Sequence, residues 1–176
     1  MRKKKRIIGI VICVAMIFSL SSCAFFEDIL TRSVNIVEKE KVFTFEDISI
    51  TLTTDFMTMD FISEDYSFIW GDGDVTVMGM EAFVGKEYME NITAEDYAVV
   101  FADELEGTES DDIGDLNGIP TIKYEAESDG ELYRYLVCIY ETADGFWVVM
   151  FGSEEDIYEK QYENICTYAK SVKISE

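Results

Sequence analysis

Residues 132–151 read LYRYLVCIYETADGFWVVMF, and this stretch predicts a long antiparallel hairpin. Its two apolar segments, 132–141 and 146–151, are separated by Ala143-Asp144-Gly145, and an Asp-Gly pair suits a tight turn because both residues tolerate positive φ. Antiparallel pairing is favoured because parallel strands need a much longer connection. Large side chains at consecutive positions are typical of a strand whose two faces are both covered.

Strands of similar character are expected on both sides of this hairpin. Ile48, Ile50 and Leu52 alternate with polar residues, which is the pattern of a half-buried strand. Turn residues at 71–74 and 128–130 separate further segments of this kind. The expected strands cover residues 42–45, 48–53, 66–70, 75–83, 121–127, 132–141 and 146–151.

Two amphipathic helices complete the predicted fold. Thr93 and Asp96 are expected to cap a helix that continues to about residue 105, and Ser153 and Asp156 to cap a helix that ends near residue 170. The length and the order of elements predict a single α+β domain over residues 42–176. Its expected architecture is a central antiparallel sheet of about six to seven strands flanked by helices.

Charge and composition restrict the function. The 176 residues include 14 basic and 36 acidic side chains, a formal net charge of −22, and this acidic excess disfavours nucleic-acid binding. The absence of His excludes Ser-His-Asp and Cys-His catalysis and every His-ligated metal site. A hydrophobic content of 48% is too high for a disordered acidic tail.

The first 23 residues have the pattern of an export signal. Five basic residues at 2–6 precede an apolar run over 7–20, within the length of a secretory signal and short for a membrane span. The run ends in Leu20-Ser21-Ser22-Cys23, which resembles the lipobox of bacterial lipoproteins. The resemblance implies a signal peptide over 1–22 and a lipid on Cys23.

An uncleaved signal anchor is the alternative, because residues 7–26 carry no charge. Both interpretations place the following residues on the extracytoplasmic face of the cell membrane, and the lipoprotein interpretation makes the lipid anchor the membrane contact. Residues 23–41 are then the lipidated Cys and a membrane-proximal connection to the domain. Export would remove five of the 14 basic residues and no acidic ones, so the mature chain would select partners with a basic surface.

The order of motifs in the domain resembles the PsbP-like family, whose fold is shared with a Ran-binding Mog protein. The resemblance covers roughly residues 42–174 and implies an α/β/α sandwich around an antiparallel sheet. It also implies a mostly noncatalytic role in binding or assembly, without naming a partner. It rests on Phe45-Glu46-Asp47-Ile48-Ser49-Ile50, on residues 93–105, on Asn117-Gly118-Ile119-Pro120-Thr121-Ile122-Lys123-Tyr124, on Gly145-Phe146-Trp147-Val148-Val149 and on the terminal Ala169-Lys170-Ser171-Val172.

The positions of the four cysteines allow one disulfide in the exported domain. Cys13 would leave with the signal peptide and Cys23 would carry lipid, so only Cys138 and Cys166 remain for a bond in the exported domain. The alternative is that both are free and that Cys138 acts as a small apolar residue in a strand.

A run of acidic residues over 104–115 is a candidate site for a hard cation such as Ca²⁺, although a solvated acidic loop is the favoured interpretation because like charges in a block repel and stay exposed. The candidate ligands are Glu106, Glu109, Asp111, Asp112 and Asp115. The Met pairs at 57/59 and 78/80 are interpreted as core residues rather than Cu(I) ligands. No other metal site is predicted.

No catalytic residue and no cofactor are predicted, because the sequence has no GxSxG, Ser-x-x-Lys, phosphate-loop or dinucleotide motif. A pair of carboxylates that hydrolyses glycans remains an alternative, although 36 acidic residues make a chance pair easy to find. The hypothesis is therefore an extracytoplasmic, membrane-anchored lipoprotein with a noncatalytic protein-interaction domain. Binding of a small ligand or a divalent cation is the alternative, with Tyr133, Tyr135, Tyr140, Phe146 and Trp147 as a possible aromatic groove.

Overall fold

The computed structural model describes residues 39–59, 65–105, 112–128 and 130–175, all within one compact unit, Lys39–Glu176. The predicted signal peptide 1–22, Cys23 and most of the connection 23–41 lie outside the described residues. The first strand of the unit begins at Glu40, two residues before the predicted start of the domain.

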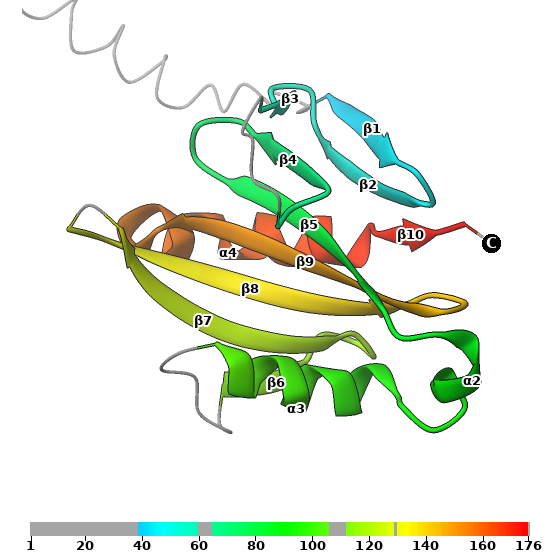
Figure 1. Cartoon of the computed structure of the whole chain (residues 1–176). Helices are drawn as coiled ribbons and strands as arrows, with labels where there is room; N and C mark the ends of the chain where they lie inside the picture. Colours follow the sequence, from blue (N-terminus) through cyan, green and yellow to red (C-terminus); the bar gives the residue numbers. More distant parts are fainter. Residues whose placement is uncertain (1–38, 60–64, 106–111, 129, 176) are drawn as a thin grey trace, which may run out of the picture. The chain divides into compact units, whose positions relative to one another are not determined.

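The main sheet has seven antiparallel strands in the order β3-β4-β5-β9-β8-β7-β6 (Figure 1). This arrangement confirms the predicted α+β class with a central antiparallel sheet. The hairpin predicted from residues 132–151 forms the middle of the sheet as β8 and β9. The strands are β3 Met57–Thr58, β4 Phe68–Gly71, β5 Thr76–Phe83, β6 Ile113–Asp115, β7 Pro120–Ser128, β8 Glu131–Glu141 and β9 Gly145–Glu154.

The first hairpin of the domain lies in a separate three-stranded sheet. The prediction that residues 42–45 and 48–53 belong to the central sheet is therefore wrong. β1 (Glu40–Phe45) pairs with β2 (Ile48–Thr53), and β2 also pairs with β10 (Lys173–Ile174) near the C-terminus. The alternating apolar residues of β2 are fully buried in the core beneath this small sheet. β10 is the third strand of this small sheet, and a strand of two residues is too short to be predicted from the sequence.

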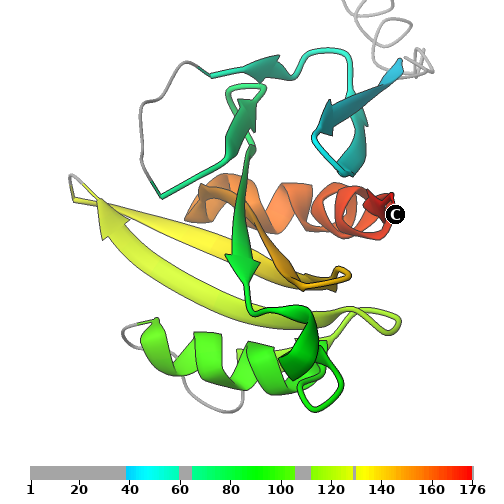
Figure 2. The ribbon, with the colours of Figure 1, turned by 45° about the vertical axis from the view of Figure 1, so that its right-hand side comes forward.

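Helices cover both faces of the main sheet (Figure 2). One face packs against α3 (Ala94–Glu104), and the other packs against α4 (Glu155–Lys170) and the small sheet. A third, one-turn helix, α2 (Lys86–Met89), follows β5. In the described part of the chain, every helix is too short or too polar to cross a bilayer.

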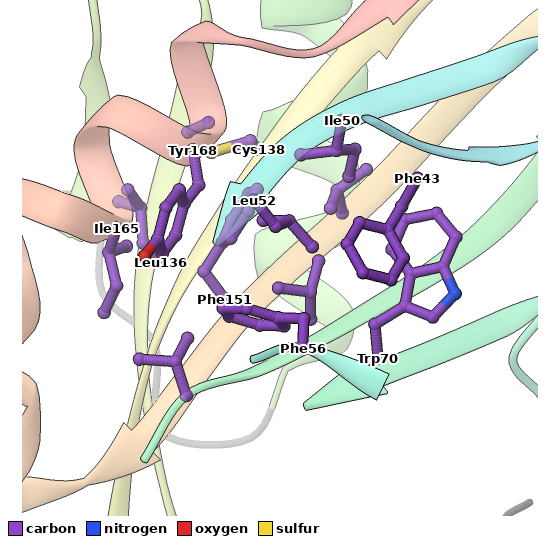
Figure 3. Close-up of a cluster of buried hydrophobic side chains, with 14 of the residues drawn as sticks. Phe43, Ile50, Leu52, Phe56, Trp70, Leu136, Cys138, Phe151, Ile165 and Tyr168 are labelled. Atoms are coloured by element: carbon purple, nitrogen blue, oxygen red, sulfur yellow. The ribbon is translucent and has the colours of Figure 1, made fainter. Parts of the chain in front are cut away.

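The central strands supply both cores by strict alternation. In β9, Trp147, Val149 and Phe151 face α4, whereas Phe146, Val148 and Met150 face α3. Figure 3 shows the α4-side cluster, in which the side chains of Phe151, Leu52 and Phe56 lie together. The six consecutive side chains of residues 146–151 are all buried, which confirms the prediction that both faces of this strand are covered.

Of the two predicted helix caps, the structure confirms one. Thr93 caps α3 as predicted, because its hydroxyl accepts from Asp96 N at 3.1 Å and the Asp96 carboxylate accepts from Thr93 N at 3.0 Å. The predicted Ser153 cap of α4 is wrong. Ser153 belongs to β9, and its hydroxyl donates to the carbonyl oxygen of Asp74 at 2.6 Å, so Glu154 stands at the N-cap.

Candidate functional site

Arg134 on β8 holds three carboxylates around one guanidinium. Its Nε lies 2.8 Å from Glu125 Oε1, its Nη2 lies 2.7 Å from Glu155 Oε1, and its Nη1 donates to Glu159 Oε1 at 2.6 Å. One positive charge faces three negative charges, so the cluster carries an excess of negative charge. It ties β7 and β8 to the first turns of α4.

Register and helical spacing produce this cluster. Glu125 lies directly opposite Arg134 in the β7–β8 ladder, so the two side chains leave the sheet on the same face. Glu155 and Glu159 are four residues apart on α4 and therefore also share one face. Desolvation acts to lower the pKa of Arg134, but the charges of Glu155 and Glu125 and the hydrogen bonds to Glu125 and Glu159 together outweigh it and raise the pKa, so the guanidinium stays protonated.

A cavity of about 550 Å³ lies beside this cluster, at the β7 side of the sheet. Its volume falls within the ~300–1,000 Å³ typical of small-ligand sites. Four tyrosines and several charged side chains line it, and the lining residues are Asp112, Lys123, Tyr124, Glu125, Arg134, Tyr135, Tyr158, Glu159 and Tyr162.

Three of these tyrosines keep their hydroxyl protons. Burial raises the pKa of Tyr135, Tyr158 and Tyr162 above the usual value for tyrosine. These side chains therefore offer neutral hydroxyls and flat apolar rings rather than phenolate charges. Rings beside carboxylates suit a cationic group, because the ring faces and the anions both attract positive charge.

Only part of the predicted aromatic groove belongs to this cavity. Tyr135 lines it, whereas Phe146 and Trp147 are fully buried in opposite cores. Tyr140 donates to the carbonyl oxygen of Ala169 at 2.8 Å and so fixes the end of α4 to the sheet. Tyr133 and Tyr135 also line a smaller cavity of about 240 Å³. The five residues therefore do not form one groove.

Of the two alternatives for the cysteines, the structure has the free thiols, since neither Cys138 nor Cys166 forms a disulfide. Cys138 is completely buried on β8, and burial raises the pKa of its thiol to about 12, with a smaller contribution from the nearby Cys166. Cys166 is partly buried on α4 and packs against the same core. The alternative interpretation of Cys138 as a small apolar residue fits this environment.

The predicted cation loop falls mostly outside the described residues, which include neither Glu106, Glu109 nor Asp111. Asp115 accepts from Gly118 N at 3.0 and 2.9 Å through its two carboxylate oxygens, which explains its place in the β6–β7 turn. Within residues 39–59, 65–105, 112–128 and 130–175, no group of three or more acidic or Cys side chains is arranged to hold a metal ion. The cation site stays a prediction.

The sequence alone did not predict the cluster of Arg134 with its three carboxylates. Arg134 and Glu125 are separated by one hairpin turn, and an alternating strand pair predicts that they face one another. Glu155 and Glu159 lie more than twenty residues further along the chain, and only the packing of α4 brings them to Arg134. Tyr158 and Tyr162 enter the cavity for the same reason.

No protein-family model and no curated protein matches the sequence. Among solved structures, the chain is similar to a protein from Bacteroides thetaiotaomicron with a TM-score of 0.54 and 10% sequence identity. The match covers 78% of this chain and 48% of the other, so the chain spans about half the length of that protein. This similarity concerns the fold alone.

Two further similarities have lower TM-scores. Cyanobacterial PsbP (CyanoP) from Synechocystis matches with a TM-score of 0.43 and 14% identity, over 81% of this chain and 95% of that protein. LpqN, involved in cell envelope biogenesis of Mycobacterium tuberculosis, matches with a TM-score of 0.49 and 12% identity, over 78% and 91% of the two chains. A PsbP protein is thus among the structures that this α+β chain resembles.

Proposed function

We propose that this chain is an extracytoplasmic lipoprotein, anchored through Cys23, whose domain binds a partner protein with a basic surface and performs no catalysis. The anchor is proposed from the basic residues 2–6, the apolar run 7–20 and the lipobox-like end of that run. Two acyl chains on Cys23 would hold the domain stably at the membrane.

The observation that carries the binding role is the cavity beside Arg134. Three carboxylates, those of Asp112, Glu125 and Glu159, and two cations, Lys123 and Arg134, line it. A fourth carboxylate, that of Glu155, also pairs with Arg134 beside the cavity, so negative charge is in excess. A basic side chain of a partner would find carboxylate oxygens and tyrosine rings together at this position. The large acidic excess of the whole chain would favour the same class of partner at long range.

A small ligand is the second candidate for the same cavity, and its volume of about 550 Å³ supports that alternative. Thermal melting of the full chain in the presence of candidate cationic small molecules tests it. A rise in Tm that Tyr162→Ala abolishes supports a small-ligand site. A Tm that no such compound changes leaves the protein partner as the proposal. Melting with millimolar Ca²⁺ tests the cation version separately.

The anchor is tested with Cys23→Ala. The lipoprotein proposal expects the mature wild-type chain to carry a lipid mass on Cys23 and to sediment with membranes. It expects Cys23→Ala to lose the lipid mass and to accumulate with its signal attached. A Cys23→Ala chain that is cleaved normally and stays in the membrane would exclude lipid as the anchor.

Partner binding is tested by photo-crosslinking in cells. A photoreactive residue replaces Glu127, which is exposed on β7 next to the cavity. The matched control carries it at Glu90, an exposed acidic residue that follows α2, at the other end of the sheet in Figure 1. The proposal expects a discrete adduct from position 127 only, formed with a peptide rich in Lys or Arg. Equal adducts from both positions, or none from position 127, would contradict it.

A further inference from the structure

β7 is much longer than the strand that covers its outer side. β6 pairs with Pro120–Ile122 only, through Asp115, Gly114 and Ile113. The remaining residues of β7, Lys123–Ser128, pair with β8 on their inner side and with no strand of the described residues on their outer side. Unpaired edges of this length are sites where a further strand can add.

The turn before β7 determines which amides point outward. Leu116 N donates to the carbonyl oxygen of Ile119 at 2.8 Å across a turn with positive φ at Asn117 and Gly118. Ile119 therefore directs its polar backbone groups toward β6, and every second residue after it does the same. Along an unbroken register, Lys123, Glu125 and Glu127 direct their N–H and C=O groups to the outer side.

The side chains of these residues lie on the face that carries the Arg134 cluster. Glu125 is opposite Arg134, and Lys123 is opposite Leu136 in the α4-side core. On the other face of β7, Tyr124 is opposite Tyr135, and their ring centroids are 5.8 Å apart. An added strand would therefore meet the carboxylates of Glu125 and Glu127 and the single ammonium group of Lys123 on one face, and tyrosine rings on the other.

We propose that the outer edge of β7 over Lys123–Ser128 binds an extended, basic segment of the partner protein by antiparallel strand addition. The inference rests on the proposed function and specifies its mode. Charge complementarity defines the segment: basic residues at alternate positions face Glu125 and Glu159, and apolar or aromatic residues between them face Tyr124 and Tyr135.

A second copy of this chain does not fit the outer edge of β7 as the added strand. Two edges that each carry Glu125 and Glu127, on chains that each have a net charge of −22, would repel one another. A monomer in sedimentation at low salt is expected, and a dimer abolished by a proline in β7 would overturn the assignment of a basic partner.

The test uses the full-length chain in detergent and a synthetic eight-residue peptide in which lysine alternates with valine or tyrosine. In an antiparallel ladder, residues that pair directly share a face and a hydrogen-bonding direction. The lysines that face Glu125 therefore donate their backbone amides to β7. One peptide is N-methylated on the lysine amides, and the matched control is N-methylated on the valine and tyrosine amides.

Strand addition predicts that methylation of the lysine amides weakens binding by roughly ten-fold or more, because several backbone hydrogen bonds are lost. Methylation of the other amides leaves the affinity close to that of the parent peptide. Equal affinities of the two methylated peptides, or no binding of the parent peptide, would overturn the proposal.

A pair of substitutions at one position gives a second test. Glu127→Ala removes a charge and keeps the outward N–H, whereas Glu127→Pro removes that N–H as well without touching the β8 ladder. Binding to Glu127→Pro is expected to be about five-fold weaker than to Glu127→Ala, with the same circular dichroism. Equal binding by two folded variants would count against strand addition.

The two proposals fail differently. If the crosslink from position 127 forms but the two methylated peptides bind equally, the partner is held by charge alone and strand addition is wrong. If position 127 gives no specific adduct in cells, the proposed function is wrong whatever the peptides do.

Discussion

The guanidinium of Arg134 on β8 donates to the carboxylate of Glu159 on α4 at 2.6 Å, and this bond joins the sheet to the helix at the candidate site. Two further carboxylates, from Glu125 and Glu155, lie within 2.8 Å of the same guanidinium. Arg134 therefore ties the first turns of α4 to the sheet beside the cavity, whereas apolar packing and the hydrogen bond from Tyr140 to Ala169 hold the rest of the helix.

Replacement of Arg134 by methionine is expected to lower Tm by several degrees. The change leaves Glu155 and Glu159 one helical turn apart without their common cation, and like charges at this spacing repel. Thermal melts at low and high salt measure the effect, and the difference from wild type should shrink as salt screens the repulsion. Lys160→Met, at an exposed position of the same helix, is the control and should change Tm little. A salt-independent difference would show that lost packing, rather than charge, is the cause.

A methyl group at position 145 is expected to cost about 1–3 kcal/mol or more, as overpacking does. The Cβ of an alanine there would overlap the backbone carbonyl oxygen of Ala82 on β5, and a rotamer change cannot move a backbone atom. Gly114→Ala is the matched control, because its Cβ would meet only the hydroxyl of Thr121 at 3.3 Å. Urea denaturation of both variants measures the difference. Equal stability of the two would contradict the close approach of β5 and β9.

Removal of the cap at Thr93 is expected to lower the free energy of unfolding by about 1 kcal/mol. Thr93→Ala loses the hydroxyl that accepts from Asp96 N, whereas Thr93→Ser keeps it and serves as the control. Denaturation in urea compares the two. A Thr93→Ser variant as unstable as Thr93→Ala would show that the methyl group of Thr93, and not the hydroxyl, is the stabilising part.

These caps show where sequence reasoning succeeds and where it stops. The Thr93 cap joins residues three positions apart, so the local sequence contains the whole interaction. Ser153 has the same local sequence signal, but a strand longer than expected includes it, and its hydroxyl donates to Asp74 from a different hairpin. A partner this far along the chain leaves no local signal.

The fold shows the same difference between local features, which the sequence predicts, and contacts between distant parts of the chain, which it does not. Apolar alternation and Asp-Gly turns predicted the β8–β9 hairpin and the antiparallel main sheet. The small sheet was missed because β2 pairs with Lys173–Ile174, more than a hundred residues away. The candidate site was missed for a related reason, since Arg134 meets two of its three carboxylates only after α4 packs on the sheet.

Alkaline pH is expected to destabilise the domain through its buried thiol and phenols. Burial raises the pKa of Cys138 to about 12 and raises the pKa of Tyr140 and Tyr158 above the usual value. The folded chain therefore keeps protons that the unfolded chain releases from about pH 8.5 for Cys and about pH 10 for Tyr. The stabilisation is complete below these values and is lost progressively as pH rises from them through the raised pKa values of the folded chain.

Urea midpoints measured from pH 7 to pH 11 test this loss. In wild type, the decline should begin near the pKa of an unfolded thiol, roughly 8.5. In Cys138→Ala it should begin later, near the unfolded tyrosine pKa of about 10. An identical decline in the two chains would show that the Cys138 thiol does not contribute.

The central claim is that the edge of β7, beside the Arg134 cluster, holds a partner in the cell. Amide hydrogen exchange of residues 123–127 tests it most directly, measured on the anchored chain in native membranes and on the purified chain alone. The claim predicts slower exchange in the membranes at Lys123, Glu125 and Glu127, whose amides point outward, and no change in the segment that contains Glu90. Exchange at residues 123–127 that is equally fast in both samples would contradict it.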